Sequence, residues 1–252
     1  MKPVKAKKYL GQHFLKDNNL AQKITNLLTE ENQNIVEIGP GMGILTKFLI
    51  MKKINLKLIE IDIESITYLR NNFEMNEKDI IHGDFLKTDI ASYFNQNISI
   101  IGNFPYNISS QILFKIYENK DQIDEVVGMF QQEVAERISS ITGRKKGILS
   151  VLIQAFYKVE YCLTINENSF NPPPKVKSAV IRLTRNKRKK LDCNELLFKK
   201  IIKSAYNQRR KTLRNALKSF NLNMNNEIND LLTLRAEKLS VEDFIKITKN
   251  VY

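Results

Sequence analysis

Cysteine, histidine and tryptophan are scarce in this chain of 252 residues, which has two cysteines, two histidines and no tryptophan. A zinc site needs about four ligands and a disulfide framework needs several paired cysteines, so the sequence predicts neither, and no metal site is expected. Cys162 lies in an apolar run, which favours a small core residue over a nucleophile.

Long apolar runs are also absent. No stretch reaches the roughly 18 unbroken apolar residues of a membrane-spanning helix, and the first five residues lack the apolar core of a secretion signal. We therefore expect a cytoplasmic protein. The sequence shows no exposed apolar repeat that would indicate a second copy, so we expect a monomer.

Acidic residues are few relative to basic ones, since 27 Asp and Glu against 40 Lys and Arg leave a net charge of +13. Such an excess favours a polyanionic partner, with nucleic acid first and an anionic membrane surface second. Neither terminus shows a strongly amphipathic basic helix of the kind that lies on membranes, so nucleic acid is preferred.

Most of this excess lies near the carboxyl end. Residues 185–220 contain thirteen Lys and Arg against two acids, Asp192 and Glu195, which leaves +11. The composition predicts two domains, residues 1–184 and a small, helical, basic domain over residues 185–252 that contacts RNA phosphates. The expected contact is one helix with a basic and an apolar stripe, whose cations are Arg209, Arg210, Lys211 and Arg214.

A glycine turn follows the apolar run at residues 34–38 and precedes a helical pattern. This is the first strand, turn and helix of a doubly wound sheet, in which a nucleotide-like ligand lies over the strand end. The turn, from Gly39 to Gly43, has glycines at every second position, and not the GxGxxG spacing that suits a pyrophosphate. The spacing disfavours an NAD oxidoreductase and favours a nucleoside without phosphate, for which S-adenosylmethionine is the obvious candidate.

Acidic residues end the next two predicted strands. The strand at residues 58–62 carries Glu60 and Asp62, and an acid at its end can hold two ribose hydroxyls. After the strand at residues 79–81, Asp84 can accept a hydrogen bond from an adenine amino group, and Phe85 can flank the ring. The alternative for Asp84 is an Asx turn after a strand.

Asn103, Phe104, Pro105 and Tyr106 follow the β-branched strand at residues 98–102. An exocyclic amino group attacks an electrophile well only when acceptors hold its hydrogens, and the Asn103 side chain with the Phe104 carbonyl would supply two acceptors. Tyr106 would stack on the base. The alternative is a plain turn at the end of a strand.

Further strands at residues 125–130, 156–161 and 178–183, with helices at 109–118 and 131–138, predict an α/β fold with a mostly parallel sheet and an antiparallel edge.

Between the last two strands, three prolines follow Phe170, which either faces Tyr106 across a base or packs into the core. At the amino end, a basic arm leads to an apolar stretch at residues 9–15, which indicates docking in place of a free tail. Asp17 is expected to cap a helix.

Seven sequence motifs occur in one order along the chain: GQHFL, VEIGPGMG, IEID, GDFL, NFPYNIS, SFNPPPKVKSAVIRL and NQRRKTLRNAL. Together they resemble the rRNA adenine N6,N6-dimethyltransferases, over nearly the whole chain. The last two motifs favour the branch that acts on 16S rRNA. The family commonly has Asn where His13 stands, and Leu or Ile where Phe104 stands.

The resemblance implies a Rossmann-like class I methyltransferase that uses S-adenosylmethionine to place two methyl groups on each of two adjacent adenines near the 3′ end of 16S rRNA, during assembly of the small ribosomal subunit. It implies that Asn103 to Tyr106 and Phe170 hold the target adenine. The cofactor would be held by His13, Leu15, Gly39, Gly41, Glu60, Asp84, Phe85 and Asn103. The expected reaction is direct attack on the sulfonium methyl, with neither a covalent intermediate nor a metal.

Three other functions remain alternatives. One is a 23S rRNA dimethyltransferase of the macrolide-resistance type, and another is a small-subunit assembly factor whose methylation is incidental. A DNA adenine methyltransferase is the third and is disfavoured, because such enzymes more often have a doubled proline where this chain has NFPY.

Overall fold

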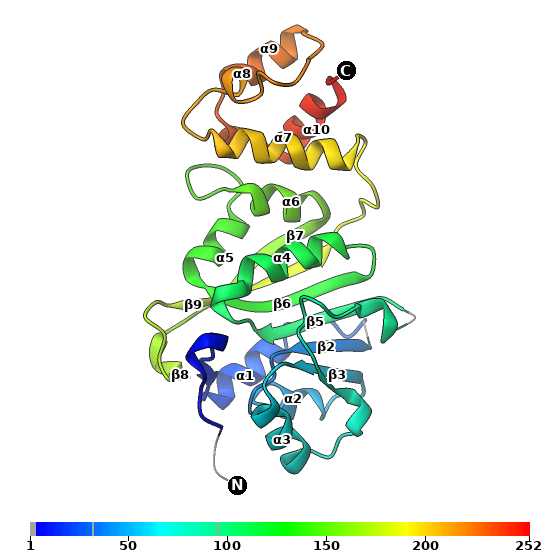
Figure 1. Cartoon of the computed structure of the whole chain (residues 1–252), viewed down its shortest axis with the longest axis vertical. Helices are drawn as coiled ribbons and strands as arrows, with labels where there is room; N and C mark the ends of the chain where they lie inside the picture. The colour runs from blue at the N-terminus through cyan, green and yellow to red at the C-terminus, as the bar shows by residue number, and fades with distance from the viewer. Residues whose placement is uncertain (1–3, 32, 95) are drawn as a thin grey trace. The chain divides into compact units, whose positions relative to one another are not determined.

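The computed structural model describes residues 4–31, 33–94 and 96–252 (Figure 1). Its contacts divide the chain into two compact units. The first contains Met1–Ala135 and Glu160–Arg185, and the second contains Glu136–Val159 and Asn186–Tyr252. The second unit therefore includes a segment before residue 160 that the composition assigns to the first domain.

A seven-stranded sheet forms the centre of the first unit, in the order β4-β3-β2-β5-β6-β9-β7. The pairs β2–β3, β3–β4, β2–β5 and β5–β6 are parallel, and β6–β9 is antiparallel. The mostly parallel sheet with an antiparallel pair confirms the predicted fold class. The strands are β2 Asn34–Ile38, β3 Asn55–Glu60, β4 Ile80–His82, β5 Ile98–Asn103, β6 Ile123–Gln131, β7 Tyr157–Ile165 and β9 Ser178–Arg185.

The strand order reverses direction between β2 and β5. From β2 the chain adds β3 and β4 on one side, and β5 and β6 on the other. Ligands of open α/β sheets bind at such a switch point, beyond the carboxyl ends of the strands. Gly39 follows β2 and Asn103 ends β5, so two of the predicted site residues lie at this point.

Helices and short 3-10 turns connect the strands. Asp17 caps the first helix by accepting a hydrogen bond from the Leu20 amide at 3.0 Å, as predicted, and Asp62 caps α3 through the Glu64 amide. The α-helices that begin in the first unit are α1 Asn18–Thr25, α2 Thr46–Leu49, α3 Ile63–Asn72, α4 Ser109–Glu118 and α5 Gln132–Ser139. The 3-10 turns among the described residues are η1 Lys8–Leu10, η2 Glu77–Asp79, η3 Ile90–Ser92, η4 Tyr106–Ile108, η5 Glu167–Ser169 and η6 Ala236–Lys238.

The amino-terminal arm docks through a small second sheet. Strand β1 (Phe14–Leu15) pairs antiparallel with β8 (Phe170–Asn171), and Leu15 lies opposite Phe170. Both side chains are buried, at 4% and 1% exposure. The apolar stretch at residues 9–15 therefore anchors the arm, which confirms the docking prediction.

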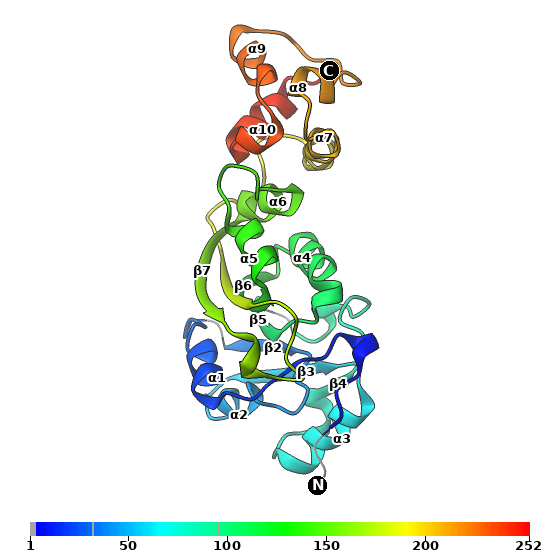
Figure 2. The same ribbon diagram turned by 90° about the vertical axis from the view of Figure 1, so that its left-hand side faces the viewer.

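The second unit consists mainly of helices and their connecting loops, with the first residues of β7 and an isolated bridge between Leu222 and Val251. Figure 2 shows its helices α7 to α10 from a second direction. They are built on buried apolar faces, for example Phe198 and Ile202 on α7 and Phe244 on α10. Its helices are α6 Ile148–Phe156, α7 Glu195–Asn207, α8 Leu213–Ala216, α9 Asn226–Thr233 and α10 Val241–Lys249.

The predicted basic helix around residues 209–214 is wrong. Helix α7 ends at Asn207 and α8 begins at Leu213, so Arg209, Arg210 and Lys211 lie in the turn between them. Thr212 is extended, with φ −66° and ψ 157°, and breaks the helical path. Consecutive cations cannot share one helix face, whereas they are favoured at a helix carboxyl end by the helix dipole.

Among the helices in the part of the chain that the structure describes, none combines the length and the apolar character needed to cross a membrane.

Candidate active site

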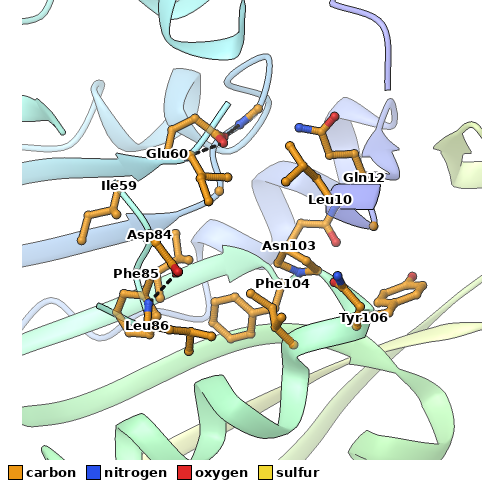
Figure 3. Close-up of a pocket in the computed structure, with 18 of the residues that line it drawn as sticks. Leu10, Gln12, Ile59, Glu60, Asp84, Phe85, Leu86, Asn103, Phe104 and Tyr106 are labelled. Atoms are coloured by element: carbon orange, nitrogen blue, oxygen red, sulfur yellow. Dashed lines mark hydrogen bonds between the residues drawn. The ribbon is translucent and has the colours of Figure 1, made fainter. Parts of the chain in front are cut away.

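A cavity of about 180 Å³ opens beyond the carboxyl ends of the parallel strands (Figure 3). Its walls come from the arm, the glycine turn, the ends of β3 and β5, and the loop after β4. The sequence-predicted residues that line it are His13, Gly39, Gly41, Glu60, Asp84, Phe85, Asn103, Phe104, Pro105 and Tyr106. The fold thus brings together residues from positions 13 to 106 of the chain.

The glycine turn needs glycine for two different reasons. Gly39 and Gly41 both have positive φ, of 63° and 57°. A Cβ at Gly41 would lie 2.7 Å from the Phe14 ring, whereas a Cβ at Gly39 would meet no atom within 4 Å. Gly39 therefore faces open space at the cavity wall, and Gly41 allows close packing against the arm.

Glu60 is buried at the end of β3 and is held by backbone amides. Its Oε1 accepts from the Ile61 and Asp62 amides at 2.8 and 2.9 Å, and its Oε2 accepts from Gly41 at 3.0 Å. Burial raises the pKa of Glu60, although these hydrogen bonds oppose the rise. A carboxylate has about four lone-pair sites, so Oε2 keeps one for a further donor such as a ribose hydroxyl.

Asp84 forms the Asx turn that the sequence left as an alternative, and it also lines the cavity. Its Oδ1 accepts from the Leu86 amide at 2.9 Å, which is the Asx turn. Asp84 also lines the cavity, where the second carboxylate oxygen remains available, and Phe85 lines the same wall with 4% exposure. Figure 3 shows Asp84, Phe85 and Leu86 together at this wall, with the Asx hydrogen bond dashed.

The Asn103 side chain is oriented by the arm. Its Nδ2 donates to the His13 carbonyl at 2.7 Å, and no described residue hydrogen-bonds its Oδ1. Because the amide nitrogen is fixed on a carbonyl, the oxygen must be the free acceptor. The neighbouring Phe104 ring is buried and packs edge-on against Phe130, with centroids 5.1 Å apart.

Tyr106 is positioned by two other segments. Its ring stacks on His13 with centroids 5.5 Å apart and planes 26° apart, and its hydroxyl hydrogen-bonds Ser178. His13 Nδ1 lies 2.8 Å from the Pro172 carbonyl, and since a carbonyl only accepts, Nδ1 donates. Burial raises the pKa of Tyr106, so the hydroxyl keeps its proton near neutral pH.

Two predicted site residues lie outside this cavity. Leu15 lines a smaller neighbouring cavity, and Phe170 is buried in the core with Leu15 and Val180. The prediction that Phe170 stacks on a base is not supported by this structure, which instead has the core packing that the sequence left as an alternative. The reason is the β1–β8 pairing, which turns the Phe170 side chain inward.

The arm closes one side of the cavity through a charge cluster. Lys7 forms ion pairs with Asp62 and Glu64, and Gln12 donates to Asp62 at 3.2 Å. Burial alone would raise the pKa of Asp62, but the hydrogen bonds from Lys7 and Gln12 outweigh it and lower the pKa. The arm residues Leu10 and Gln12, which line the cavity, were not predicted as site residues.

Sequence reasoning also missed Glu37. It lies in β2, is 1% exposed and accepts a 2.7 Å hydrogen bond from Thr46 Oγ1. Burial raises its pKa from 4.5 to about 8, so the carboxyl is mostly protonated at neutral pH. The sequence signal that could have drawn attention to Glu37 is an acid inside the otherwise apolar run from Ile35 to Ile38.

The cations of the second unit differ in their surroundings. The Arg209 guanidinium bonds Glu237 at 2.9 Å and also the Arg144 carbonyl, so much of its hydrogen-bonding capacity is used internally. Arg214 donates to Asn229 at 3.2 Å. Arg210 and Lys211 are exposed and have no partner among the described residues.

The described residues contain no group of three or more His, Cys, Asp and Glu side chains that could hold a metal ion.

A family model described as ribosomal RNA adenine dimethylase matches residues 4–251. The chain belongs to this family. It is 52% identical to ribosomal RNA small subunit methyltransferase A of Cytophaga hutchinsonii over 252 residues, which is 98% of each chain. The proteins of the same name from Flavobacterium johnsoniae and Bacteroides thetaiotaomicron are 52% and 53% identical, over all of this chain and 97% and 96% of their own.

Two solved structures share the fold of this dimethylase. A dimethyladenosine transferase from Plasmodium falciparum has a TM-score of 0.76 at 24% identity, covering 93% of this chain and 96% of its own. The 23S rRNA methyltransferase ErmE has a TM-score of 0.74 at 20% identity, covering 94% and 99%. At these identities the likeness shows the fold alone.

S-adenosylmethionine is the cofactor that the dimethylase family implies, and the site fits it. Glu60 and Asp84 place carboxylates in the cavity wall, which suits a cationic ligand and opposes a phosphate. Gly39 leaves open space, and Glu60 Oε2 has a free lone-pair site for a hydroxyl. When bound, the cofactor supplies an electrophilic methyl group on a sulfonium.

We expect Glu37→Gln to change how the stability of the dimethylase depends on pH. Between about pH 4.5 and 8 the folded protein keeps a proton on Glu37 that the unfolded chain has lost, so the free energy of unfolding falls as pH rises through this window. The glutamine variant lacks this dependence. Its free energy of unfolding should therefore increase relative to that of wild type as the pH rises through this window.

Thermal unfolding of both proteins at a series of pH values measures this effect. The exposed Glu31→Gln substitution makes the same chemical change at the surface and is the control. A stability difference between Glu37→Gln and wild type that stays constant with pH would contradict the buried, protonated carboxyl.

Proposed function

We propose that this dimethylase transfers two methyl groups to N6 of each of two adjacent adenosines near the 3′ end of 16S rRNA, in the cytoplasm, as a step of small-subunit assembly. Two findings support the proposal. For the substrate, relatives at 52–53% identity over nearly their whole lengths are named small subunit methyltransferases. The observation that carries the chemistry is the free Asn103 Oδ1, whose orientation the His13 carbonyl fixes.

The Asn103 Oδ1 would accept a hydrogen bond from the target amino group. The amino lone pair is delocalised into the adenine ring, and an acceptor outside the ring plane favours the more tetrahedral nitrogen that attacks well. The Phe104 carbonyl would accept a second hydrogen bond, from the other N–H of the same amino group. Pro105 has no amide hydrogen, so it cannot compete as a donor next to that carbonyl.

Tyr106 would hold the base by stacking. One face of its ring is covered by His13 and its hydroxyl is fixed by Ser178, so the ring is fixed before the base arrives. Stacking on an aromatic ring contributes ~1–3 kcal/mol per base and is independent of sequence. Such a ring suits a base that has been turned out of its RNA strand.

Proton removal needs no dedicated base in this scheme. The amino nitrogen becomes acidic only after it has gained the methyl group, and its proton can then leave to water. The contribution of the protein is therefore positioning and the exclusion of competing water, as expected when the electrophile already carries its leaving group.

The second unit would bind the rRNA through its exposed cations. Arg210 and Lys211 are free for phosphates, whereas Arg209 would support the turn by holding Glu237 and the Arg144 carbonyl. In this proposal the helical domain at residues 185–252 is the RNA-binding part, and the chain acts as a monomer.

The substrate is tested by incubating the protein with labelled S-adenosylmethionine and, separately, undermethylated small subunits, 23S rRNA and DNA. Mass mapping of the labelled nucleosides then identifies the product. Dimethyladenosine confined to the small-subunit RNA is the expected result. Label in 23S rRNA would assign the protein to the resistance-type activity, and tight binding with no label would leave a non-catalytic assembly role.

We expect Asn103→Ala to lower kcat by about 10² to 10³-fold, the usual effect of removing one positioned group that acts in the transition state. The KM for small-subunit RNA should change little, because the exposed cations supply most of the RNA affinity. Steady-state kinetics on undermethylated subunits measure both. Asn97→Ala, just before the other end of β5, is the matched control. Equal losses of turnover and RNA binding would contradict the role of Asn103.

The pair Arg210→Ala and Lys211→Ala should weaken rRNA binding and flatten its salt dependence. For every phosphate that the variant no longer neutralises, the slope of log K against log salt should fall by roughly 0.7–0.9. Binding is measured by filter retention of labelled RNA at several salt concentrations. Lys23→Ala with Lys53→Ala removes two exposed cations of the first unit as a control. An unchanged slope in the first double variant would overturn the assignment of this turn.

A further inference from the structure

The loop after β4 carries two cavity residues and depends on another segment for part of its hydrogen bonding. Within the loop, the Lys87 and Thr88 amides donate to the Asp84 carbonyl at 2.9 and 3.0 Å, and the Leu86 amide donates to Asp84 Oδ1. These bonds close the turn around Asp84. The carbonyls of Leu86 and Thr88 accept hydrogen bonds from a donor outside the loop.

That donor is Lys115 on α4, about thirty residues further along the chain. Its Nζ donates to the Leu86 carbonyl at 3.0 Å and to the Thr88 carbonyl at 2.5 Å. The same ammonium lies 5.2 Å from the centre of the Phe85 ring, a cation–π distance. One side chain thus contacts three of the four residues that follow Asp84.

The ammonium is held in this place without a direct ion pair to any described carboxylate. Burial lowers the pKa of Lys115, and the charges of Asp84, Asp89 and Glu118 oppose that shift. A desolvated cation is costly unless its hydrogen bonds are made, so the position of Lys115 and the position of the two carbonyls depend on each other.

Lys115 does not line the cavity, whereas Asp84, Phe85 and Leu86 do. We propose that Lys115 is a positioning residue, which fixes the loop after β4 so that Asp84 and Phe85 recognise the adenine of the cofactor. This inference rests on the proposed function, because it assigns an adenine nucleoside to this cavity. Figure 3 shows Asp84 at the wall beside Phe85 and Leu86, two of the residues that Lys115 contacts.

The positioning role has a signature that simple stabilisation of α4 lacks. If Lys115 holds Asp84 against the adenine amino group, its loss should weaken the discrimination between an adenine and a base without that group. S-adenosylhomocysteine and its deaminated analogue S-inosylhomocysteine differ there, because the analogue has a carbonyl in place of the amino group and repels the Asp84 carboxylate.

The experiment is calorimetric titration of both compounds into the full-length wild type, Lys115→Met, Lys115→Arg and Lys87→Met. Lys87 is exposed on the same loop, so its variant removes one cation at the surface and is the matched control. We expect Lys115→Met to raise the Kd for S-adenosylhomocysteine about tenfold and to reduce the preference over the inosine analogue by a similar factor. Lys115→Arg should restore part of both, and Lys87→Met should match wild type.

Unfolding curves of each variant, with and without ligand, separate affinity from folding. If Lys115→Met is unfolded at the assay temperature, Lys115→Gln replaces it. Glutamine keeps amide donors but loses the charge, so the losses of affinity and of discrimination should each be about threefold. Unchanged affinity and unchanged discrimination in a folded variant would overturn the inference. Titration needs no RNA, so a wild type that binds the ligand but methylates no rRNA would refute the proposed function without refuting the role of Lys115.

Discussion

The hydrogen bond from Asn103 Nδ2 to the His13 carbonyl links the two halves of the candidate active site. It joins the end of β5 to an arm ninety residues earlier, and it leaves the Asn103 oxygen as an oriented acceptor. Two contacts hold the arm on either side of His13, so that it can supply this carbonyl. Leu15 lies opposite Phe170 in the β1–β8 pairing, and Lys7 forms an ion pair with Asp62. The orientation of the Asn103 acceptor therefore depends on the docking of the arm.

Three buried acids, Glu37, Glu60 and Asp62, lie at or close to the ends of β2 and β3, and their surroundings shift their pKa values in different ways. Burial raises the pKa of Glu37 and of Glu60, whereas contacts from the arm lower the pKa of Asp62. Glu60 meets its burial cost through three backbone amides. The carboxylates that line the cavity are those of Glu60 and Asp84, and they favour a cationic nucleoside over a phosphate-bearing one, in agreement with the family.

The cations of the second unit show why counting charges is a poor guide to contacts. Arg209, Arg210 and Lys211 are consecutive in the sequence, but the first is engaged with Glu237 and the Arg144 carbonyl while the others are exposed. A guanidinium that holds two segments together contributes to the shape of a surface. Exposed, unpaired cations beside it are the ones free to meet phosphates.

The parallel strands, the glycine turn and the clustering of Glu60, Asp84 and Asn103 could be predicted from the sequence, because strand periodicity and strand ends are local properties and parallel strands end at one edge. The family likewise followed from motifs and their order. The core position of Phe170, the turn from Arg209 to Lys211 and the protonated state of Glu37 are seen only in the folded chain. The position of Phe170 depends on its pairing with the distant strand β1, the turn is held by the contact of Arg209 with Glu237, and the protonation of Glu37 depends on burial. No local pattern encodes these three features.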